Sequence, residues 1–277
     1  MPPRLAACWA LTAFAASIVA LPGPAAADYA LSVSGTYQSS SNSTFRTDGT
    51  NVVTDDLPPI LDLGRLRGGS FEATFVFPQV TPRTSGTFAT YPFGPRYGMT
   101  FRLFDAAGAV VHEGTSPSSP FAFIFHNQPT RTGAIDQASL FAFVNTVTNL
   151  HFPSVVVGPS QIADVFQSGL IFDGDVTATT HFLNDLSIPV DAATYLRFPR
   201  RTFSTGVEWT DGDSSGSGPS QYIETHVSYD ITSVRVAAVP EPGSALLLAA
   251  GAATFGVARR ARSRPRRGAR PVDGRSP

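Results

Sequence analysis

Short segments in which apolar and polar residues alternate one by one recur through most of the chain, and they constrain its fold more than any other feature. Between Phe71 and Phe77 every second residue is apolar, and the segment from Tyr97 to Leu103 repeats the pattern. A period of two is that of a β-strand with one buried face. Clusters of Pro, Gly, Ser and Asp separate these segments. The sequence therefore predicts an all-β fold, an antiparallel and jelly-roll-like β-sandwich over residues 28–236, with a closed barrel as the alternative.

Four local patterns give more detailed expectations within this fold. The Asp105–Gly108 segment is a turn signal between two alternating runs, and it predicts a β-hairpin. The run from Tyr195 to Phe198 predicts a short strand. A stretch rich in Ser, Thr and Asn predicts a loop or a polar edge over residues 38–56, and residues 162–170 suggest a short helix.

The charged residues are few and unevenly distributed. They make up 15% of the chain, all 20 basic residues are Arg, and the hydrophobic share is 42%. This composition excludes an intrinsically disordered chain and a polytopic membrane protein. Residues 28–239 contain eleven Arg and nineteen acidic residues, a net charge of −8, whereas residues 259–277 contain eight Arg and one Asp, a net charge of +7. The chain therefore consists of an acidic body and a basic tail.

Residues 1–27 have the three parts of a secretory signal peptide. Arg4 is followed by a mostly apolar run, then by helix breakers, and then by three alanines that end at Ala27. This order predicts an apolar signal helix, export, and cleavage by signal peptidase after Ala27. A buried N-terminal helix is the alternative, but no polar residues mark a solvent face. The single cysteine, Cys8, lies in this segment, so the mature chain is predicted to lack thiol and disulfide chemistry.

The C-terminal end combines three segments with different properties. Residues 237–244 form a linker rich in Pro, residues 245–258 are apolar and uncharged, and residues 259–277 form the basic tail. With two uncharged linker residues, the apolar run is 16 residues long; as a helix it measures about 24 Å, against about 30 Å for a hydrocarbon core. It predicts a short transmembrane helix, marginal as a permanent anchor, and a core helix is the alternative. The basic residues expected to stop transfer and keep the tail in the cytoplasm are Arg259, Arg260 and Arg262.

Pro240, Glu241 and Pro242, followed by the short apolar run and the Arg cluster, resemble the PEP-CTERM sorting signal of Gram-negative bacteria. The resemblance implies that an exosortase recognises these three residues, which are a sorting motif and not an active site. It also implies an intermediate anchored in the inner membrane and later release to the cell surface or extracellular matrix, usually in species that make exopolysaccharide. The chemistry is consistent with this role, because a Pro on each side of Glu241 prevents a helix and keeps the segment extended for a membrane-embedded protease.

Few residue patterns in the body point to catalysis. The five His are scattered singly, and no nucleophile elbow, P-loop or dinucleotide-binding motif is present. The exception is a pair of carboxylates, because Glu208 and Glu224 lie on the two strands that flank the 211–218 loop and could be neighbours across a hairpin. Two such acids are the catalytic pair of many glycosidases. The alternative is that both face the solvent and protect the sheet against edge pairing.

Ion binding is the other chemistry that this loop suggests. Asp211, Asp213 and Ser215 match the start of a calcium loop, with oxygen atoms at alternate positions and a Gly at the sixth. Tyr222 stands at the twelfth position, where a bidentate Glu is expected, so the pattern predicts only a weak calcium site. No other cofactor is expected.

Two weaker signals complete the set. A second short acidic turn is predicted at Asp173–Asp175. The aromatic residues in or beside loops, which would suit sugar stacking if exposed, are Tyr91, Phe93, Tyr97 and Trp209.

Together these observations predict an exported, non-catalytic protein of the cell surface or biofilm matrix, adhesive or associated with exopolysaccharide. A secreted carbohydrate-active enzyme that uses Glu208 and Glu224 is the alternative, and a permanently anchored membrane protein is a third class. The expected partners are signal peptidase, exosortase and, transiently, the inner membrane. Nucleic acid is not expected to bind the basic tail, because the apolar segment before it places the tail at a membrane.

Overall fold

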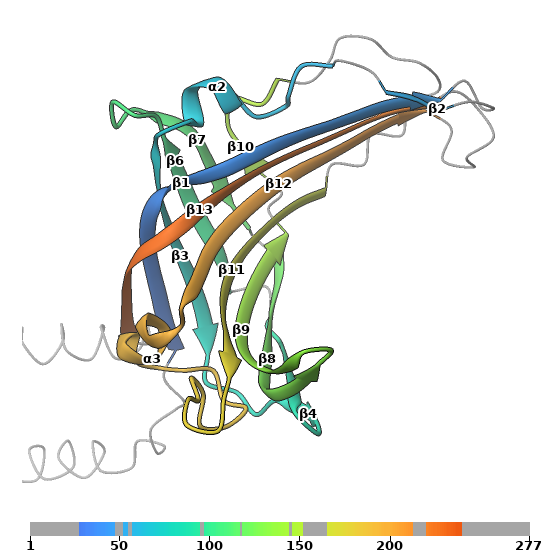
Figure 1. Cartoon of the computed structure of the whole chain (residues 1–277). Coiled ribbons are helices and arrows are strands. Elements are labelled where there is room, and N and C mark those ends of the chain that lie inside the picture. Colours follow the sequence, from blue (N-terminus) through green and yellow to red (C-terminus); the bar gives the residue numbers. More distant parts are fainter. Residues whose placement is uncertain are drawn as a thin grey trace, which may run out of the picture. The chain divides into compact units, whose positions relative to one another are not determined.

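A computed structural model describes most of the acidic body. The described residues are 28–47, 52–54, 57–94, 97–116, 118–143, 146–151, 165–212 and 220–239. They form a thirteen-stranded antiparallel sheet and two short helices, which confirms the all-β fold (Figure 1). The expected signal peptide, the sorting motif, the apolar run and the basic tail lie outside the described residues.

The strands cover most of the described chain. In chain order they are β1 (Asp28–Thr47), β2 (Val52–Thr54), β3 (Ser70–Pro78), β4 (Arg83–Ser85), β5 (Phe88–Pro92), β6 (Gly98–Phe104), β7 (Val110–Thr115), β8 (Ser118–Thr130), β9 (Gly133–Phe143), β10 (Thr146–Val147), β11 (Val165–Val176), β12 (Arg200–Gly212) and β13 (Ser220–Val239). The described helices are α2 (Leu63–Leu66) and α3 (Ala192–Arg197).

All these strands belong to one continuous sheet. Its order is β10-β7-β6-β3-β1-β13-β12-β11-β9-β8-β5-β4, and β2 pairs with β1. Every neighbouring pair is antiparallel, as hairpins and short loops favour. In the described part of the chain the end strands β10 and β4 do not pair with each other, so the sheet is open and does not form the closed barrel that was the alternative.

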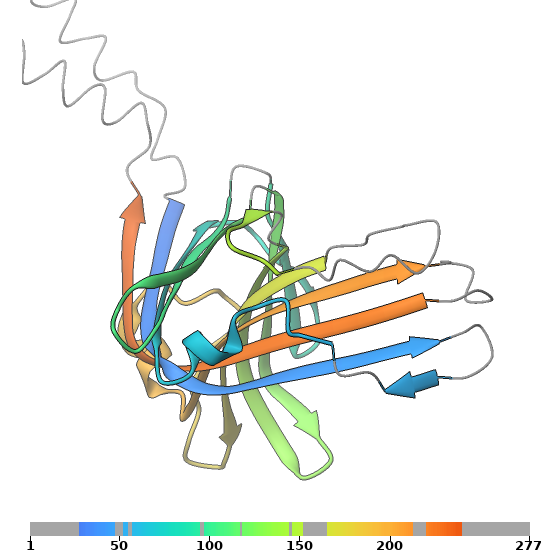
Figure 2. The same ribbon diagram turned by 90° about the horizontal axis from the view of Figure 1, so that it is seen from above.

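The sheet bends back on itself, so its two halves face each other and enclose the core (Figure 2). Phe203 of β12 shows this directly. Its ring stacks on Phe71 of β3 at 4.5 Å between centroids and lies 5.7 Å from Phe101 of β6, although neither strand is its neighbour in the sheet. The result is a sandwich-like arrangement made from one sheet rather than from two separate sheets.

The alternating segments bury the face that the sequence predicts. Phe71 and Phe77 are each 1% exposed, and Leu103 is fully buried, whereas Glu72 between the first two is exposed. Each such side chain contributes about 1.5–3 kcal/mol through the apolar area removed from water. Strand alternation is therefore the local feature that assigns residues to the core.

The Asp105–Gly108 hairpin is also confirmed. Gly108 has φ 82°, a conformation that side chains with a Cβ rarely adopt, and the Asp105 carboxylate accepts hydrogen bonds from the backbone N–H groups of Ala107 at 3.0 Å and Ala109 at 2.9 Å. These contacts close the connection between β6 and β7.

For residues 38–56 the loop is wrong over most of the length, whereas the polar-edge alternative holds, because residues 39–44 pair with β13 and with no other described strand. Strand β1 continues to Thr47 and pairs with β13 along its whole second half, from Ser39 opposite Ser228 to Thr47 opposite Ser220. Serine and asparagine have low strand propensity, but backbone pairing with a long partner strand overrides it. In Figure 1 this half of β1 runs beside β13 and β12 towards β2.

Two further local predictions are wrong for identifiable reasons. The segment expected as a strand from Tyr195 to Phe198 lies mainly in helix α3, because Asp191 caps the helix and accepts from the Thr194 backbone N–H at 2.8 Å. The helix suggested over residues 162–170 is instead a strand from Val165 onwards, since β9 and β12 pair with it on both sides.

The last strand extends beyond the expected end of the body at residue 236. It continues to Val239, which pairs with Asp28, the first residue of β1. The Tyr97 hydroxyl donates to the Asp28 carboxylate at 3.0 Å. The strand pair therefore ends immediately before Pro240, and residues 237–239 belong to the sheet rather than to a linker.

A buried carboxylate joins three separate segments at one end of the sheet. Asp136 of β9 is fully buried, and its Oδ1 accepts from the Asn127 N–H at 2.8 Å and lies 3.1 Å from His126 Nδ1. Its Oδ2 accepts from the N–H groups of Phe182 at 2.8 Å and Leu183 at 3.0 Å. Burial alone would raise the pKa of Asp136, but these donors outweigh it and lower the pKa, so the group stays ionised.

A buried imidazole joins β7 to the segments beside it. His112 is fully buried, and its Nδ1–H donates to the Thr148 carbonyl at 2.9 Å, while its Nε2 accepts from the Asp62 N–H at 3.1 Å. Both ring nitrogens are thus used by the neutral form. Burial lowers the pKa of His112 and outweighs the hydrogen bond to Thr148 and the charge of Asp62, which both raise it.

We expect His112 to make the body less stable in mild acid. Because its folded-state pKa lies below the unfolded value of about 6.5, the unfolded state takes up the proton first as the pH falls. The contribution to stability is therefore complete above the unfolded pKa and is lost as the pH falls towards the folded pKa. Denaturant unfolding at pH 7, 6 and 5 measures this slope.

The His112→Gln variant should be less stable than the wild type at pH 7 and should show a flatter slope between pH 7 and 5. His181→Gln is the matched control, because His181 is exposed in part and lies outside this network. An unchanged slope in His112→Gln would show that another group controls the dependence.

Candidate functional site

The outer face of the sheet carries a shallow groove that runs across five strands. Its two sides are rows of outward-facing side chains, each row linked from strand to strand by the register. The first row consists of Arg235, Ser32, Thr74, Thr100 and Thr115. The second row consists of Ser233, Ser34, Glu72, Arg102 and Glu113.

The floor of the groove is the backbone of the row between them, because this row has no outward-facing side chain. It consists of Val33, Ala73, Phe101 and Gly114, which face one another across β1, β3, β6 and β7. The Phe101 ring lies against the backbone of Gly114, where a Cβ would overlap it. Gly114 is therefore required to keep both the core contact and the level floor.

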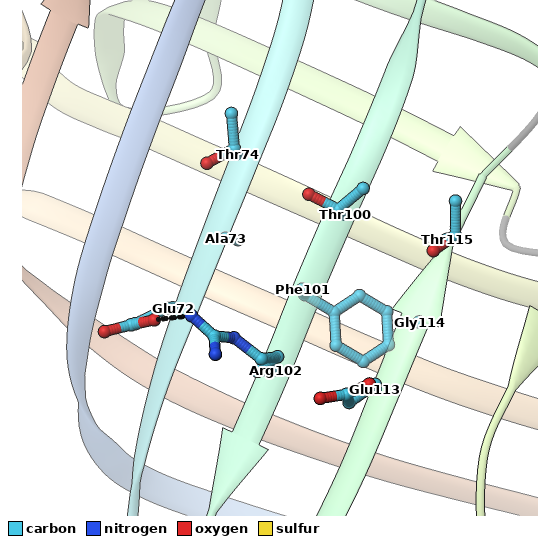
Figure 3. Close-up of a pocket in the computed structure, with 9 residues that line it drawn as sticks. All are labelled: Glu72, Ala73, Thr74, Thr100, Phe101, Arg102, Glu113, Gly114 and Thr115. Atoms are coloured by element: carbon cyan, nitrogen blue, oxygen red, sulfur yellow. Dashed lines mark hydrogen bonds and ion pairs between the residues drawn. The ribbon is translucent and has the colours of Figure 1, made fainter. Parts of the chain in front are cut away.

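Two contiguous depressions make up the outer groove. One, of about 310 Å³, lies over β3, β6 and β7, and the other, of about 280 Å³, lies over β13, β1 and β3. They share Glu72, Ala73 and Thr74. Figure 3 shows the first depression, with Thr74, Thr100 and Thr115 in one row and Glu72, Arg102 and Glu113 in the next.

The groove is polar and its charges balance. Arg102 donates to the Glu72 carboxylate at 2.7 Å, and both side chains are about half exposed, so the pair adds at most about 1 kcal/mol. Ser32 and Thr74 share a hydrogen bond of 3.1 Å between their hydroxyl groups. Hydroxyl groups both donate and accept, so both rows can pair with a ligand rich in hydroxyls.

The predicted carboxylate pair is the second candidate site. Glu208 and Glu224 lie directly opposite each other on β12 and β13, as the hairpin argument expects. Directly opposed residues have Cβ atoms about 4.5–5.5 Å apart. Glu224 accepts from the Tyr222 hydroxyl at 3.1 Å, and its Oε1 lies 2.6 Å from His226 Nε2.

These contacts determine the electrostatics of the pair. The hydrogen bond from His226, assisted by that from Tyr222, lowers the pKa of Glu224 and keeps it ionised. Burial raises the pKa of Tyr222, and its contacts with Glu224 and Glu208 raise it further. Tyr222 also stacks on Phe45 at 4.5 Å, which fixes its ring.

Most of the predicted calcium loop lies outside the described residues. Asp213 and Ser215 lie outside the described residues, and Asp211 is paired with Gln221 at the end of β12. Across the described ranges, no group of three or more His, Cys, Asp or Glu is arranged to hold a metal ion.

The second acidic turn is wrong. Asp173 and Asp175 lie within strand β11, and both carboxylates pair with Arg200 of β12, Asp175 at 3.0 Å. The arginine lies opposite Asp173 in the register, so strand pairing and not a loop brings these charges together.

The loop aromatics singled out for sugar stacking are part of the core. Tyr91 is 2% exposed, Phe93 6%, Tyr97 7% and Trp209 3%. The residues of the outer groove were missed, because single polar positions on five strands carry no motif. The outward positions of each strand do show in its alternation, but their alignment depends on register.

The last predicted feature is the sorting motif with the membrane segment and basic residues that follow it. The described sheet ends at Val239, one residue before Pro240. Among the residues with a described structure, neither helix has the length and apolar character to span a bilayer. The predicted membrane segment, residues 245–258, and the basic residues Arg259, Arg260 and Arg262 lie outside that part of the chain.

Comparison with known protein families identifies one segment. Residues 238–263 match the PEP-CTERM protein-sorting motif, which contains Pro240, Glu241 and Pro242. No curated protein and no solved structure matches the chain. The sorting signal, which follows the antiparallel β-sheet body, supports export and targeting to the cell surface. The chain carries a PEP-CTERM domain, and it is an exported protein that exosortase sorts to the cell surface.

Proposed function

We propose that this is a non-catalytic protein of the cell surface or extracellular matrix that holds an extended polysaccharide in the outer groove. The observation that carries the proposal is the pair of polar rows, which line both sides of a groove that crosses five strands. Adhesion within a biofilm matrix follows if the bound polysaccharide belongs to that matrix.

The repeat of the groove suits a linear polymer of sugar rings. Neighbouring strands are about 4.8 Å apart, so hydrogen-bonding groups recur at that interval along both sides, over about 19 Å from β13 to β7. This interval is close to the length of one sugar ring in an extended chain. Each contact is weak, and several along one polymer add up through a high effective concentration.

Removing hydroxyl groups from the first row tests the proposal. Thr74→Val combined with Thr100→Val keeps the side-chain shape and deletes two hydrogen-bonding groups, each of which contributes about 1 kcal/mol. We expect the dissociation constant for polysaccharide extracted from the producing cells to rise by at least about tenfold. Isothermal titration calorimetry on the exported protein measures it.

Thr202→Val is the matched control, since Thr202 is an outward-facing residue of β12 outside the groove. It should leave binding unchanged. If the wild type does not bind the polysaccharide, or if the groove variant binds as tightly as the control, the proposal fails.

The route to the surface is part of the same proposal. Residues 1–27 would direct export and be removed by signal peptidase, and residues 245–258 would hold the protein in the inner membrane until exosortase acts. The support is the length of the uncharged run, about 24 Å as a helix, which is short for a permanent anchor. Arg259, Arg260 and Arg262 would keep the tail in the cytoplasm.

A carbohydrate-active enzyme is the second candidate, favoured by the direct opposition of Glu208 and Glu224 across β12 and β13. A glycosidase pair needs one ionised carboxylate as nucleophile or base, and the lowered pKa of Glu224 suits Glu224 to that role. Glu208→Gln with Glu224→Gln should abolish polysaccharide turnover if this candidate is right. Equal turnover by the double variant and the wild type would exclude it.

A further inference from the structure

Six phenylalanines form a continuous ladder on the outer face of the other half of the sheet. Their strand neighbours Ala122, Ile124 and Leu140 point inward and are fully buried, so the six rings point away from the core. Strand β8 thus carries apolar side chains on both faces between residues 121 and 125. The members of the Phe ladder, on β5, β8 and β9, are Phe88, Phe121, Phe123, Phe125, Phe141 and Phe143.

The rings pack against one another and not against the core. Phe88 stacks on Phe125 at 4.8 Å and on Phe123 at 5.6 Å, and Phe121 stacks on Phe141 at 5.5 Å. An edge-to-face contact of 5.1 Å between Phe121 and Phe123 joins the two groups. Much of each ring face is therefore covered by a neighbouring ring, and ring edges form a large part of the remaining exposed surface of the ladder.

The packing of the rings determines which kind of partner the ladder can contact. A sugar stacks on an open ring face, and the stacking leaves few such faces. The ring of Phe141 also lies against Gly169 of β11, where a Cβ would overlap it, so its inner side is covered as well. The ladder suits another apolar surface into which ring edges can insert.

Few charges border the ladder. The outward positions next to the rings include Thr90, Gln137 and Ser139, which are uncharged, and the exposed Arg83 of β4 lies directly opposite Thr90. The body as a whole, residues 28–239, carries a net charge of −8. In the described part of the chain no acidic residue is a cross-strand partner of a ladder ring, so two such bodies can approach through the ladder with less repulsion than through their acidic surfaces.

The exposed area limits the strength of any association. Phe143 is 41% exposed and the other five rings are less exposed. At about 200 Å² for each side chain, the ladder leaves less than about 500 Å² accessible, against about 800 Å² per partner in a standard stable interface. An association through the ladder alone is thus weak and reversible.

We propose that the Phe ladder is the surface through which two copies of this protein associate face to face. A second copy presents the same apolar face, and a two-fold arrangement lets each ladder meet the other. Sorting directs all copies to the cell surface, where their local concentration is high. The association rests on burial of apolar area between like-charged bodies, so added salt strengthens it.

Sedimentation velocity of the exported protein, as released by cells, tests this over a range of protein and salt concentrations. The wild type should show a monomer–dimer equilibrium that shifts towards the dimer at higher salt. Thr90→Arg places a second positive charge beside Arg83 within the ladder and should raise the dimer dissociation constant at least about tenfold, because this charge would be buried at an apolar interface without a counter-charge. Thr100→Arg is the matched control on the opposite half of the sheet and should dimerise like the wild type.

Phe143→Ser provides a second variant with little risk to folding, since Phe143 is the most exposed ring; it should also weaken the dimer at an unchanged melting temperature. A monomer at all concentrations, dimerisation weakened by salt, or equal dimerisation of Thr90→Arg and Thr100→Arg would overturn the proposal. Thr100 lies in the outer groove, so its variant is expected to weaken polysaccharide binding but not dimerisation. The two proposals can therefore fail independently of each other.

Discussion

Replacing Asp136 with Ala is expected to lower the free energy of unfolding by about 3–5 kcal/mol, because it leaves three buried backbone N–H groups without an acceptor. These groups belong to Asn127, Phe182 and Leu183, so one carboxylate holds the β8–β9 region against the loop that follows β11. Chemical denaturation of the exported protein at pH 7 measures the loss.

Asp175→Ala is the matched control, because Asp175 makes its ion pair with Arg200 at the surface, where its side chain is 72% exposed. Its loss should cost less than about 1 kcal/mol. A similar small loss for Asp136→Ala would mean that water replaces the carboxylate at little cost. The low pKa of Asp136 adds a further expectation: its contribution is present above the unfolded pKa of about 3.9 and is lost as the pH falls through the folded value.

Replacing Glu241 with Ala is expected to block sorting while leaving the body folded. Glu241 is the only charged residue of the Pro240–Pro242 motif, and a site that pairs with a carboxylate discriminates strongly against its absence. We expect the released fraction to fall at least about a hundredfold, given the discrimination typical of such sites. Mass spectrometry of released and cell-bound protein distinguishes the processed chain from one that keeps residues 245–277.

Glu113→Ala serves as the control for this experiment, because Glu113 lies in the body and is exposed. It should be released like the wild type, and both variants should melt at the wild-type temperature. Normal release of Glu241→Ala would show that the carboxylate takes no part in recognition by exosortase.

The elements that could be predicted are those whose signal is local. The inward face of β3 follows from the spacing of Phe71 and Phe77, and the β6–β7 hairpin follows from Asp105 and Gly108. The opposition of Glu208 and Glu224 was also accessible, since the two strands are consecutive and joined by one loop. Sequence separation is short in each case, so the local pattern decides the outcome.

The wrong prediction for residues 39–47 has the opposite property. Serine-rich residues 39–47 form a strand because β13, nearly two hundred positions later, supplies the backbone partners. The segment from Tyr195 is a helix rather than the expected strand, because Asp191 caps it. This cap is a local signal that the sequence itself contains.

The amino-acid sequence alone determined that the body is a β-sheet, which faces of its strands are apolar, and that its end carries a sorting signal. Only the tertiary structure decided that the rows of Thr, Glu and Arg align into one groove, that Asp136 joins β8 to the loop after β11, and that six Phe side chains lie outside the core. The physical reason is that alternation along a strand is encoded by neighbouring residues. The register between strands depends instead on pairing between distant parts of the chain, and a shift of one residue would turn each side chain to the other face.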